Sequence, residues 1–324
     1  MKVLVTGASG FIGGRLIGRL TAAACKPRAL VRGSLSLPGV ECVSAALEDA
    51  EGLQRACRGM DAIVHCAGHA HAFGEGDGQS GDLHRKINYE ATARLAELAA
   101  REGVSRFVFL SSVKAAGHDG KAVYDELCQI PPVGAYGESK RMAETALQEC
   151  GRRTGMGTVV LRLAMTYGRG GRGNLERMAA AIRAGWFPPL PRTAAPRSVL
   201  HVDDAVSATL VALVHERAPG RSFIVADPVA YSARQLQDAI RHALGLSELG
   251  RGMPAGLLRL AGALGDGAGR LAGLCLPLRS EVVGRLLDAE CYSSDRIRAE
   301  LGWQARMGLR DGIAEMLGQG GVQA

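Results

Sequence analysis

Closely spaced glycines follow the first apolar run of the chain, and they limit more than any other feature what the chain can fold into. The run Lys2–Thr6 has the composition of a strand, and Gly7, Gly10 and Gly13 separate it from a helical pattern. In such a unit the first glycine permits a sharp turn, the second lets the backbone approach a pyrophosphate, and the third lets helix and strand pack closely. The N–H groups at the helix N-terminus attract phosphates. Because glycines also serve ordinary turns, the predicted dinucleotide site depends on the rest of the chain. Three further residues of the turn are expected to line it: Ser9, Phe11 and Ile12.

Strand-like runs and helical patterns alternate after this unit. Five more runs are typical of strands: Arg28–Arg32, Ala62–Cys66, Arg106–Ser111, Thr158–Leu163 and Ser222–Val225. Helical patterns lie between them near Gly14–Ala23, Glu51–Cys57, Tyr89–Glu102 and Ser139–Thr154. This alternation predicts an α/β fold with a Rossmann-type, doubly wound parallel sheet, which binds ligands beyond the carboxyl ends of its strands. We therefore expect Ala67, Gly68 and Ser112, which follow two of these runs, to lie at the ligand edge.

The regular alternation of strand-like and helical segments ends after Leu163. A glycine-rich stretch at 168–173 is followed there by a proline-rich stretch at 186–196. From Ser232 onward helices and turns dominate. We predict two domains on this basis. Residues 1–165 and about 199–228 would bind the cofactor, and about 166–198 with 229–324 would form a smaller, mostly helical substrate domain.

Composition excludes several classes of protein. The formal net charge is +7, but the arginines are dispersed without interleaved aromatic residues, which favours a basic cleft for a small anion over a nucleic-acid surface. The eight cysteines form no C-x-x-C pair and no apolar leader precedes the first strand, so we expect reduced thiols in a cytoplasmic protein. The stretch 253–278 is too polar to span a membrane. Its amphipathic character leaves peripheral membrane contact open, and we interpret it as a helical lid.

Tyr136-Gly-Glu-Ser-Lys140 is expected at the head of a helix. Positions four residues apart share a helix face, so Lys140 should lie near the phenol of Tyr136. A tyrosine with a pKa of about 10 shuttles protons poorly at neutral pH. A nearby ammonium would favour the phenolate and lower that pKa, while Ser112 could hold a carbonyl oxygen. The alternative is an exposed helix start with a solvated lysine; the glycine turn and Ser112 favour the catalytic interpretation.

Together with further motifs in the same order, these residues resemble the extended short-chain dehydrogenase/reductases. The motifs are Thr6–Gly13, Asn88, Ser111-Ser112, Tyr136-x-x-x-Lys140, Leu161–Gly168 and His201–Asp204. Within that family the chain is most similar to the nucleotide-sugar epimerases, dehydratases and 4-ketoreductases. The resemblance implies that Ser112, Tyr136 and Lys140 form the catalytic triad. It also implies that Lys140 and Tyr136 contact the cofactor, with Lys140 at the nicotinamide ribose, and that Asn88 supports the site. It also suggests a homodimer formed through the helices at 89–102 and 139–154.

Three departures from the family pattern narrow the expected reaction. The dehydratases carry an Asp-Glu pair directly after the position of Ser112, whereas this chain has Val113-Lys114, which disfavours dehydration. NAD-dependent members end their second strand in Asp, whereas this chain has Arg32 there. An arginine suits a 2′-phosphate, so NADP(H) is the favoured cofactor. NAD(H) stays possible, and so does the alternative that Arg32 only faces solvent. Near the adenine the usual acidic residue is replaced by Ala46, which leaves contacts to the backbone or to Leu47.

Candidate substrate residues follow from the same resemblance. Arg197 stands where UDP-sugar epimerases present an arginine to the diphosphate, Asn174 matches the residue that opens the substrate-side helix, and Arg285 is a second candidate clamp. Guanidinium groups pair well with phosphates, although each of these could be an ordinary surface arginine. The histidines show no metal-ligand spacing, so no metal is expected.

Arg32 favours NADPH and therefore a net reduction. The stretch Phe109–Lys114 also resembles the bacterial 4-ketoreductases of surface polysaccharide synthesis, and this resemblance implies a 4-keto nucleotide sugar as substrate, with UDP as the expected nucleotide and a 6-deoxy-N-acetylhexosamine as the expected sugar. One alternative is a UDP-hexose 4-epimerase that keeps NAD bound. A second, from a different class, is a non-catalytic dinucleotide-sensing regulator; the presence of Ser112, Tyr136 and Lys140 together disfavours it, because a sensor has no need of all three.

Overall fold

A seven-stranded parallel sheet forms the centre of the protein. The computed structural model describes residues 1–69, 77–120, 123–132, 134–192, 195–250, 252–272 and 279–319. The strand order is β3–β2–β1–β4–β5–β7–β11, and every neighbouring pair is parallel. The strands are β1 (Lys2–Thr6), β2 (Lys26–Val31), β3 (Glu41–Ser44), β4 (Ala62–His65), β5 (Arg106–Ser112), β7 (Gly157–Leu163) and β11 (Arg221–Val225). The predicted Rossmann-type sheet is confirmed. The sequence-based prediction did not include one of its seven strands, the half-exposed edge strand β3, because β3 has no continuous apolar run.

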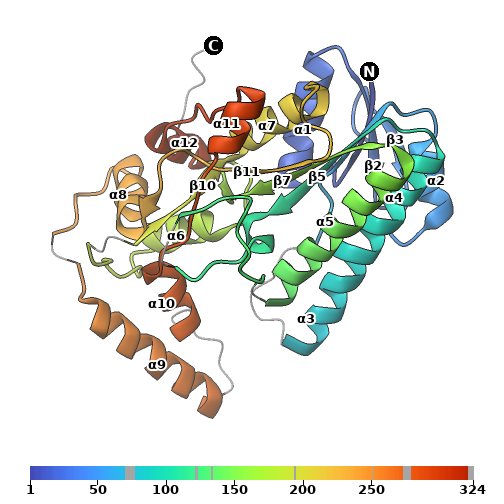
Figure 1. Cartoon of the computed structure of the whole chain (residues 1–324). Coiled ribbons are helices and arrows are strands. Elements are labelled where there is room, and N and C mark those ends of the chain that lie inside the picture. The colour runs from blue at the N-terminus through green and yellow to red at the C-terminus, as the bar shows by residue number, and fades with distance from the viewer. Residues whose placement is uncertain are drawn as a thin grey trace.

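Helices cover both faces of this sheet (Figure 1). On one face α1 (Phe11–Ala22) packs against α7 (Val202–Val214); on the other lie α2 (Ala50–Cys57), α4 (Ala91–Arg101) and α5 (Gly134–Thr154). Successive side chains of a strand point to opposite faces. In β1, Val3 and Val5 accordingly join the α1 core while Leu4 joins the α2–α4–α5 core, and all three are fully buried.

A third core lies in the later part of the chain. It contains residues of α6 (Asn174–Arg183), α8 (Ala233–Ala243), α9 (Ala255–Ala272), α10 (Ser280–Leu287) and α12 (Leu309–Met316). Short strand pairs border it: β8 (Met165–Tyr167) with β10 (Val199–His201), β9 (Pro196–Arg197) with β12 (Tyr231–Ser232), and β6 (Val123–Tyr124) with β13 (Cys291–Tyr292). The helix α11 (Asp295–Leu301) returns to the sheet, where Ile297, Leu301 and Trp303 enter the α1 core. The two-domain division by residue range stays a prediction.

The start of α8 shows how the local sequence determines where a helix begins. Ser232 and Gln235 form a capping box at the start of α8, which satisfies N–H groups that the helix leaves unpaired.

The stretch 253–278, which the sequence predicts to be a helical lid, contains the helix α9 at 255–272. Helix α9 packs against α10. No helix among the described residues is long and apolar enough to cross a membrane.

Candidate functional site

The glycine turn joins the carboxyl end of β1 to α1. Gly7 has a φ of +67°, which side chains rarely adopt, and a Cβ there would lie 2.8 Å from the backbone nitrogen of Ala67. A Cβ on Gly13 would collide with the carbonyl oxygen of Gly7. Gly10 precedes α1 without a side-chain cap, so the first N–H groups of the helix face outward without an internal acceptor. The turn therefore has the open helix start and the close backbone packing that its sequence predicts.

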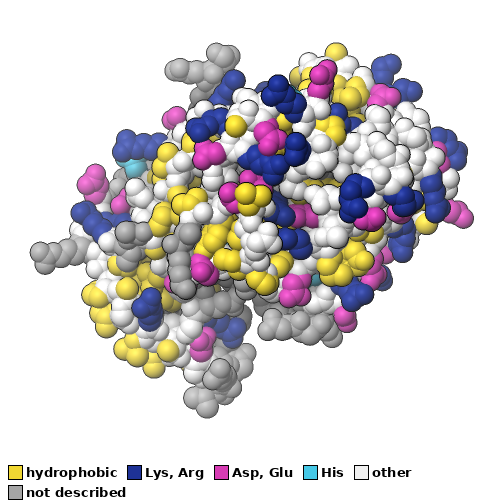
Figure 2. Space-filling view, viewed as in Figure 1, with side chains coloured by type: hydrophobic (Ala, Val, Ile, Leu, Met, Phe, Trp, Pro, Cys, Tyr) yellow, Lys and Arg dark blue, Asp and Glu magenta, His cyan; other side chains and the backbone are white. Residues whose placement is uncertain are grey.

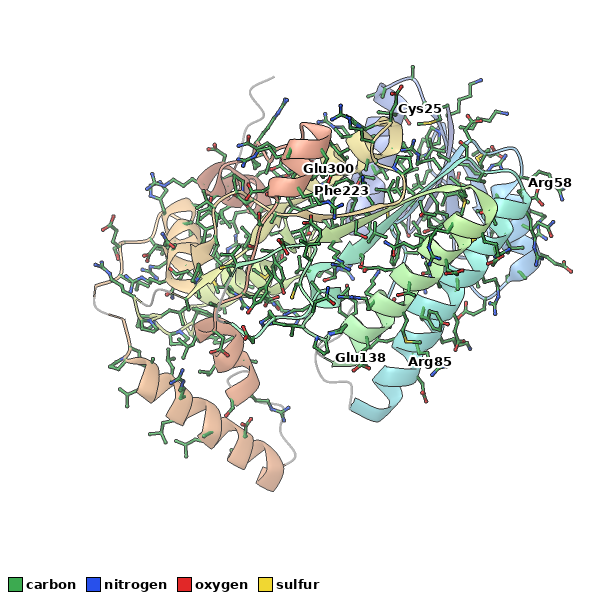
Figure 3. The ribbon with its side chains drawn as sticks, viewed as in Figure 1. Cys25, Arg58, Arg85, Glu138, Phe223 and Glu300 are labelled. Carbon is green, nitrogen blue, oxygen red and sulfur yellow. The ribbon has the colours of Figure 1, made fainter. Side chains whose placement is uncertain are left out.

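Ser112 and Tyr136 meet at the carboxyl edge of the sheet. Ser112 ends β5, and its Oγ accepts a hydrogen bond from the backbone N–H of Lys114 at 3.2 Å, which opens a single 3₁₀ turn, Val113–Ala115. Tyr136 lies in the first turn of α5, whose lower end is marked by Glu138 in Figure 3. Helix α5 begins five residues earlier than the predicted helix at 139–154, which brings Tyr136 into its first turn. A hydrogen bond joins the Tyr136 phenol to the Ser112 side chain.

Burial controls the acidity of this tyrosine. It raises the pKa of Tyr136, and the hydrogen bond with Ser112, which lowers it, compensates only in part. The expected lowering of this pKa by Lys140 is wrong for the chain without ligand, because desolvation of the phenolate outweighs any nearby ammonium. The phenol is consequently protonated at neutral pH.

Lys140 is buried one helical turn after Tyr136. Its Nζ donates a hydrogen bond to the carbonyl oxygen of Leu110 at 3.1 Å and lies 4.7 Å from the centre of the Phe109 ring. Burial lowers the pKa of Lys140 to about 8, although the carboxylate of Glu144 opposes the shift. Lys140 is therefore fixed against β5, and its ammonium loses its proton at a lower pH than that of a free lysine.

Asn88 lies beside Lys140 on an unusual helical turn. Residues 85–90 form a π-helix between α3 (Asp77–His84) and α4, and the N–H of Ala91 bonds to the carbonyl of Lys86, five residues back. Asn88 accepts from the N–H of His69 at 2.7 Å and donates to its carbonyl at 3.0 Å. A Cβ on Gly68 would lie 3.1 Å from Asn88 Oδ1 and 3.2 Å from Lys140 Nζ. The structure thus brings Gly68, Asn88 and Lys140 together.

A buried chain of hydrogen bonds links the glycine turn to Asn88. Thr92 Oγ1 donates to the carbonyl of Asn88 at 2.7 Å, so it accepts from Nε2–H of His65 at 2.9 Å. His65 Nδ1 then accepts from Thr6 Oγ1 at 2.6 Å, and Thr6 accepts from the N–H of Ala67 at 3.2 Å. Burial lowers the pKa of His65 to about 3, which keeps the ring neutral. Neither His65 nor Thr92 is assigned a role by the sequence motifs; the position of His65 near the end of a predicted strand is the one signal that points toward the site.

A second buried network fixes α5 against the sheet. Glu144 receives a hydrogen bond from Ser111 Oγ at 2.6 Å and from Nη2 of Arg162 at 2.7 Å, with Arg162 Nε at 3.1 Å from both carboxylate oxygens. Both charged residues are buried. Glu144 lies one turn beyond Lys140 on α5, so the network positions the helix that carries both Tyr136 and Lys140.

The predicted substrate residues have different surroundings. Arg197 donates to Oε2 of Glu290 at 2.7 Å, and Lys114 Nζ lies 2.7 Å from the other carboxylate oxygen. These two cations lower the pKa of the buried Glu290 against the effect of burial. Asn174 opens α6 as predicted and its amide approaches Met165 Sδ at 3.9 Å. The side chain of Arg285 lies outside the described residues.

The remaining predicted cofactor residues lie at the same edge. Arg32 follows β2 directly and is exposed, while Leu47 packs partly buried against the second core. Ser9 is exposed and Phe11 is half-buried, whereas Ile12 packs on the α1 core.

One cluster away from this edge has ligand-like geometry. His201, Asp203 and Glu315 could hold a metal, but Arg15 donates to Asp203 at 2.9 Å and to Glu315 at 2.8 Å. The Arg15 guanidinium therefore already pairs with both carboxylates.

Comparisons with known proteins agree with this geometry. Residues 3–226 match the family model described as the NAD dependent epimerase/dehydratase family. A UDP-glucose 4-epimerase of Vibrio cholerae is 25% identical over 97% of this chain and 94% of its own length. A 3-diazoavenalumate denitrifying reductase of a Streptomyces species is 30% identical over 97% of this chain and 99% of its own. The structure of MoeE5 with UDP-glucose and NAD superposes with a TM-score of 0.77 over 98% of each chain, at 22% identity.

Proposed function

The chain belongs to the NAD dependent epimerase/dehydratase family, and from this premise we propose that it reduces a 4-keto nucleotide sugar with NADPH. The observation that carries the proposal is the protonated, buried phenol of Tyr136, which is hydrogen-bonded to Ser112 at the end of β5. A reduction needs a proton donor at the oxygen of the substrate, and a phenol of raised pKa is in the donor state at neutral pH. Both reductases and epimerases occur among the relatives.

The residues present fit a nicotinamide dinucleotide. Side chains are excluded at Gly7 and Gly13, and the uncapped start of α1 leaves N–H groups for a pyrophosphate. A Cβ on Gly68, the residue after Ala67, would crowd both Asn88 and Lys140, so a side chain is disfavoured there too. When bound, the reduced cofactor would supply a hydride to the keto carbon. Arg32 would pair with a 2′-phosphate, which is why NADPH is preferred over NADH.

Side chains of the protein would orient the keto oxygen of the substrate and donate the proton to it. Ser112 Oγ would donate to the keto oxygen and orient it, while Tyr136 Oη would transfer its proton to the same oxygen as negative charge develops there. The Lys140 ammonium, held by Leu110, would stabilise the phenolate that remains. Lys114 replaces the acidic residue on which a dehydratase depends, so the proposed reaction ends at the alcohol.

Arg197 and Lys114 would face the anionic part of the substrate, which we take to be a UDP diphosphate. Both are held by Glu290, and their combined charge exceeds that of one carboxylate. Asn174 and Arg285 stay candidates for the same role. The homodimer through α4 and α5 also stays a proposal.

The decisive experiment offers the purified enzyme a UDP-linked 4-keto-6-deoxy-N-acetylhexosamine with NADPH or NADH. We expect NADPH to be oxidised faster than NADH, and NMR of the product to show a new hydroxyl-bearing C4. The Tyr136→Phe variant is the matched control, because it should bind cofactor without turnover. Failure to oxidise either cofactor would reject the reductase.

The 4-epimerase is the second candidate, favoured by the Vibrio cholerae relative. An epimerase oxidises and re-reduces one sugar, so it keeps its cofactor bound. Absorbance and fluorescence of the freshly purified protein distinguish the two: co-purified NAD(H) together with interconversion of UDP-hexoses supports the epimerase. A protein that binds dinucleotide but turns over neither substrate would instead fit the regulatory sensor.

A further inference from the structure

A buried histidine, which the proposed mechanism does not use, lies against the ring of Tyr136. His84 ends α3 and is 0% exposed, and little of the face shown in Figure 2 has the colour of histidine. Helix α3 packs against α5, and Figure 3 marks the two helices near this contact by Arg85 and Glu138. The centres of the His84 and Tyr136 rings are 5.6 Å apart, with the ring planes inclined by 65°. The two rings are therefore in edge-to-face contact.

The amide of Asn88 determines which nitrogen of His84 carries the hydrogen. Its Oδ1 accepts from the backbone N–H of His69 and its Nδ2 donates to the carbonyl of the same residue, so the two ends of the amide cannot be interchanged. Asn88 Nδ2 lies 3.3 Å from Nδ1 of His84. Because an amide NH₂ group only donates, Nδ1 accepts and the ring hydrogen lies on Nε2. His84 is therefore a neutral imidazole whose orientation is set by Asn88.

Asn88 also reaches the backbone of Tyr136. Its Nδ2 lies 3.2 Å from Ser139 Oγ, and that hydroxyl donates to the carbonyl oxygen of Tyr136 at 2.8 Å. The same amide is thus connected to the main chain of Tyr136 through Ser139 and to its ring through His84. A side chain that is held only at its backbone can still change its χ angles. The contact with His84 is what limits the rotation of the Tyr136 ring.

We propose that His84 is a positioning residue, which holds the Tyr136 ring in the orientation in which its hydroxyl bonds to Ser112. The inference rests on the proposed function, because it concerns the proton donor of that reaction. A proton donor has to lie within hydrogen-bond reach of the keto oxygen, and a small misplacement lowers the rate strongly. The ring of His84 is itself held in place, because it also contacts the ring of His69, with the centres 4.9 Å apart.

The uncharged His84 ring also keeps water away from the phenol. Burial is what raises the pKa of Tyr136. A smaller side chain at position 84 would leave space for water, which stabilises the phenolate, so the pKa of Tyr136 should fall. The ring contact thus has two consequences that can be measured separately, one on turnover and one on the acidity of Tyr136.

Two replacements separate the ring of His84 from its nitrogen. His84→Asn keeps an acceptor for the Asn88 amide without the ring, and His84→Phe keeps a ring without the acceptor. We expect His84→Asn to lower kcat about tenfold or more, while the KM for NADPH changes less than about twofold. His84→Phe should keep kcat within about threefold of the parent, because the edge-to-face contact remains. Parent-like kcat in His84→Asn, or an equal loss in both variants, would overturn the proposal.

Tyrosine NMR tests the same contact without substrate. With ¹³C at the ring carbon that bears the hydroxyl, the six tyrosines give six signals, and the Tyr136→Phe variant identifies the signal of Tyr136. In His84→Asn this signal should titrate at a pH at least about half a unit below that of the parent and of His84→Phe. An unchanged Tyr136 signal in His84→Asn would overturn the proposal whether or not the enzyme is active. A parent that shows this difference but reduces no 4-keto sugar would instead refute the proposed reaction alone.

Circular dichroism and thermal unfolding establish that the compared variants are folded. Where His84→Asn does not fold, His84→Gln takes its place, because it also lacks the ring and is closer to histidine in volume. His242→Asn is the control, since His242 is an exposed histidine in the last turn of α8. It should leave kcat, KM and the Tyr136 signal unchanged. A loss of kcat in His242→Asn as large as that in His84→Asn would also overturn the proposal.

Discussion

Glutamine at position 144 should strongly destabilise the protein, although it changes one atom of a buried side chain. Glu144 is 2% and Arg162 is 6% exposed, and the guanidinium has Nη1 buried without a hydrogen-bond partner among the described residues. After Glu144→Gln the Arg162 guanidinium would lose the carboxylate that it is hydrogen-bonded to and keep only a longer-range interaction with the carboxylate of Glu126. Removing one partner of a buried ion pair costs about 3–5 kcal/mol. The same change also removes the carboxylate that opposes the effect of burial on Lys140, so the pKa of Lys140 should fall below about 8.

Urea denaturation of three variants and the parent protein measures this effect. Glu144→Gln should lose about 3–5 kcal/mol, and the double variant Glu144→Gln/Arg162→Met should recover about 2–3 kcal/mol of that loss. Glu149→Gln is the control on the same helix: its pair with Arg152 is exposed, so it should lose less than about 1 kcal/mol. A loss as small as that of Glu149→Gln, or a double variant less stable than Glu144→Gln, would refute the reasoning.

Three further predictions follow from single positions. Tyr136→Phe should lower kcat at least about a hundredfold while dinucleotide affinity, measured by fluorescence titration, stays within about twofold; retained turnover would sink the assigned proton donor. Arg32→Ala should raise the KM for NADPH about tenfold or more and leave the KM for NADH unchanged; equal effects on both cofactors would contradict the 2′-phosphate contact. His65 has a pKa of about 3 when folded against 6.5 for a free histidine. The unfolded chain therefore binds the extra proton between these values, and stability should be lost as pH falls from 6.5 toward 3. His65→Gln should flatten this loss in denaturation series, and an unchanged pH dependence would argue against a neutral buried ring.

The sequence predicted those parts of the site that depend on local spacing. The glycine turn requires three positions without side chains within seven residues, and the Tyr136–Lys140 pair requires only that one helix contain both. Apolar strands alternating with helices likewise predicted the sheet, because each strand carries its own signal. Such features are visible in a single sequence, since the interacting residues are neighbours along the chain.

Contacts between distant positions could not be predicted in this way. Glu290 lies 93 residues beyond Arg197, and nothing near it in the sequence marks it as the partner of two basic side chains. The acidity of Tyr136 was also misjudged, because helical spacing indicates the proximity of an ammonium but not how much water the fold removes. Burial, which decides that pKa, comes from the packing of the whole chain.

The π-helical turn at Asn88 makes the length of this segment part of the geometry of the candidate site. Each residue added to or removed from a helix rotates everything beyond it by about 100°. Deleting one residue between positions 85 and 90 would let an ordinary α-helix run from α3 into α4, but it would turn Asn88 away from His69 or shift Thr92 away from His65. Evolution can therefore exchange most side chains of α4 more easily than it can change the number of residues before it. The extra residue of the π-helical turn therefore keeps Asn88 oriented toward His69 and Thr92 oriented toward His65 at the same time.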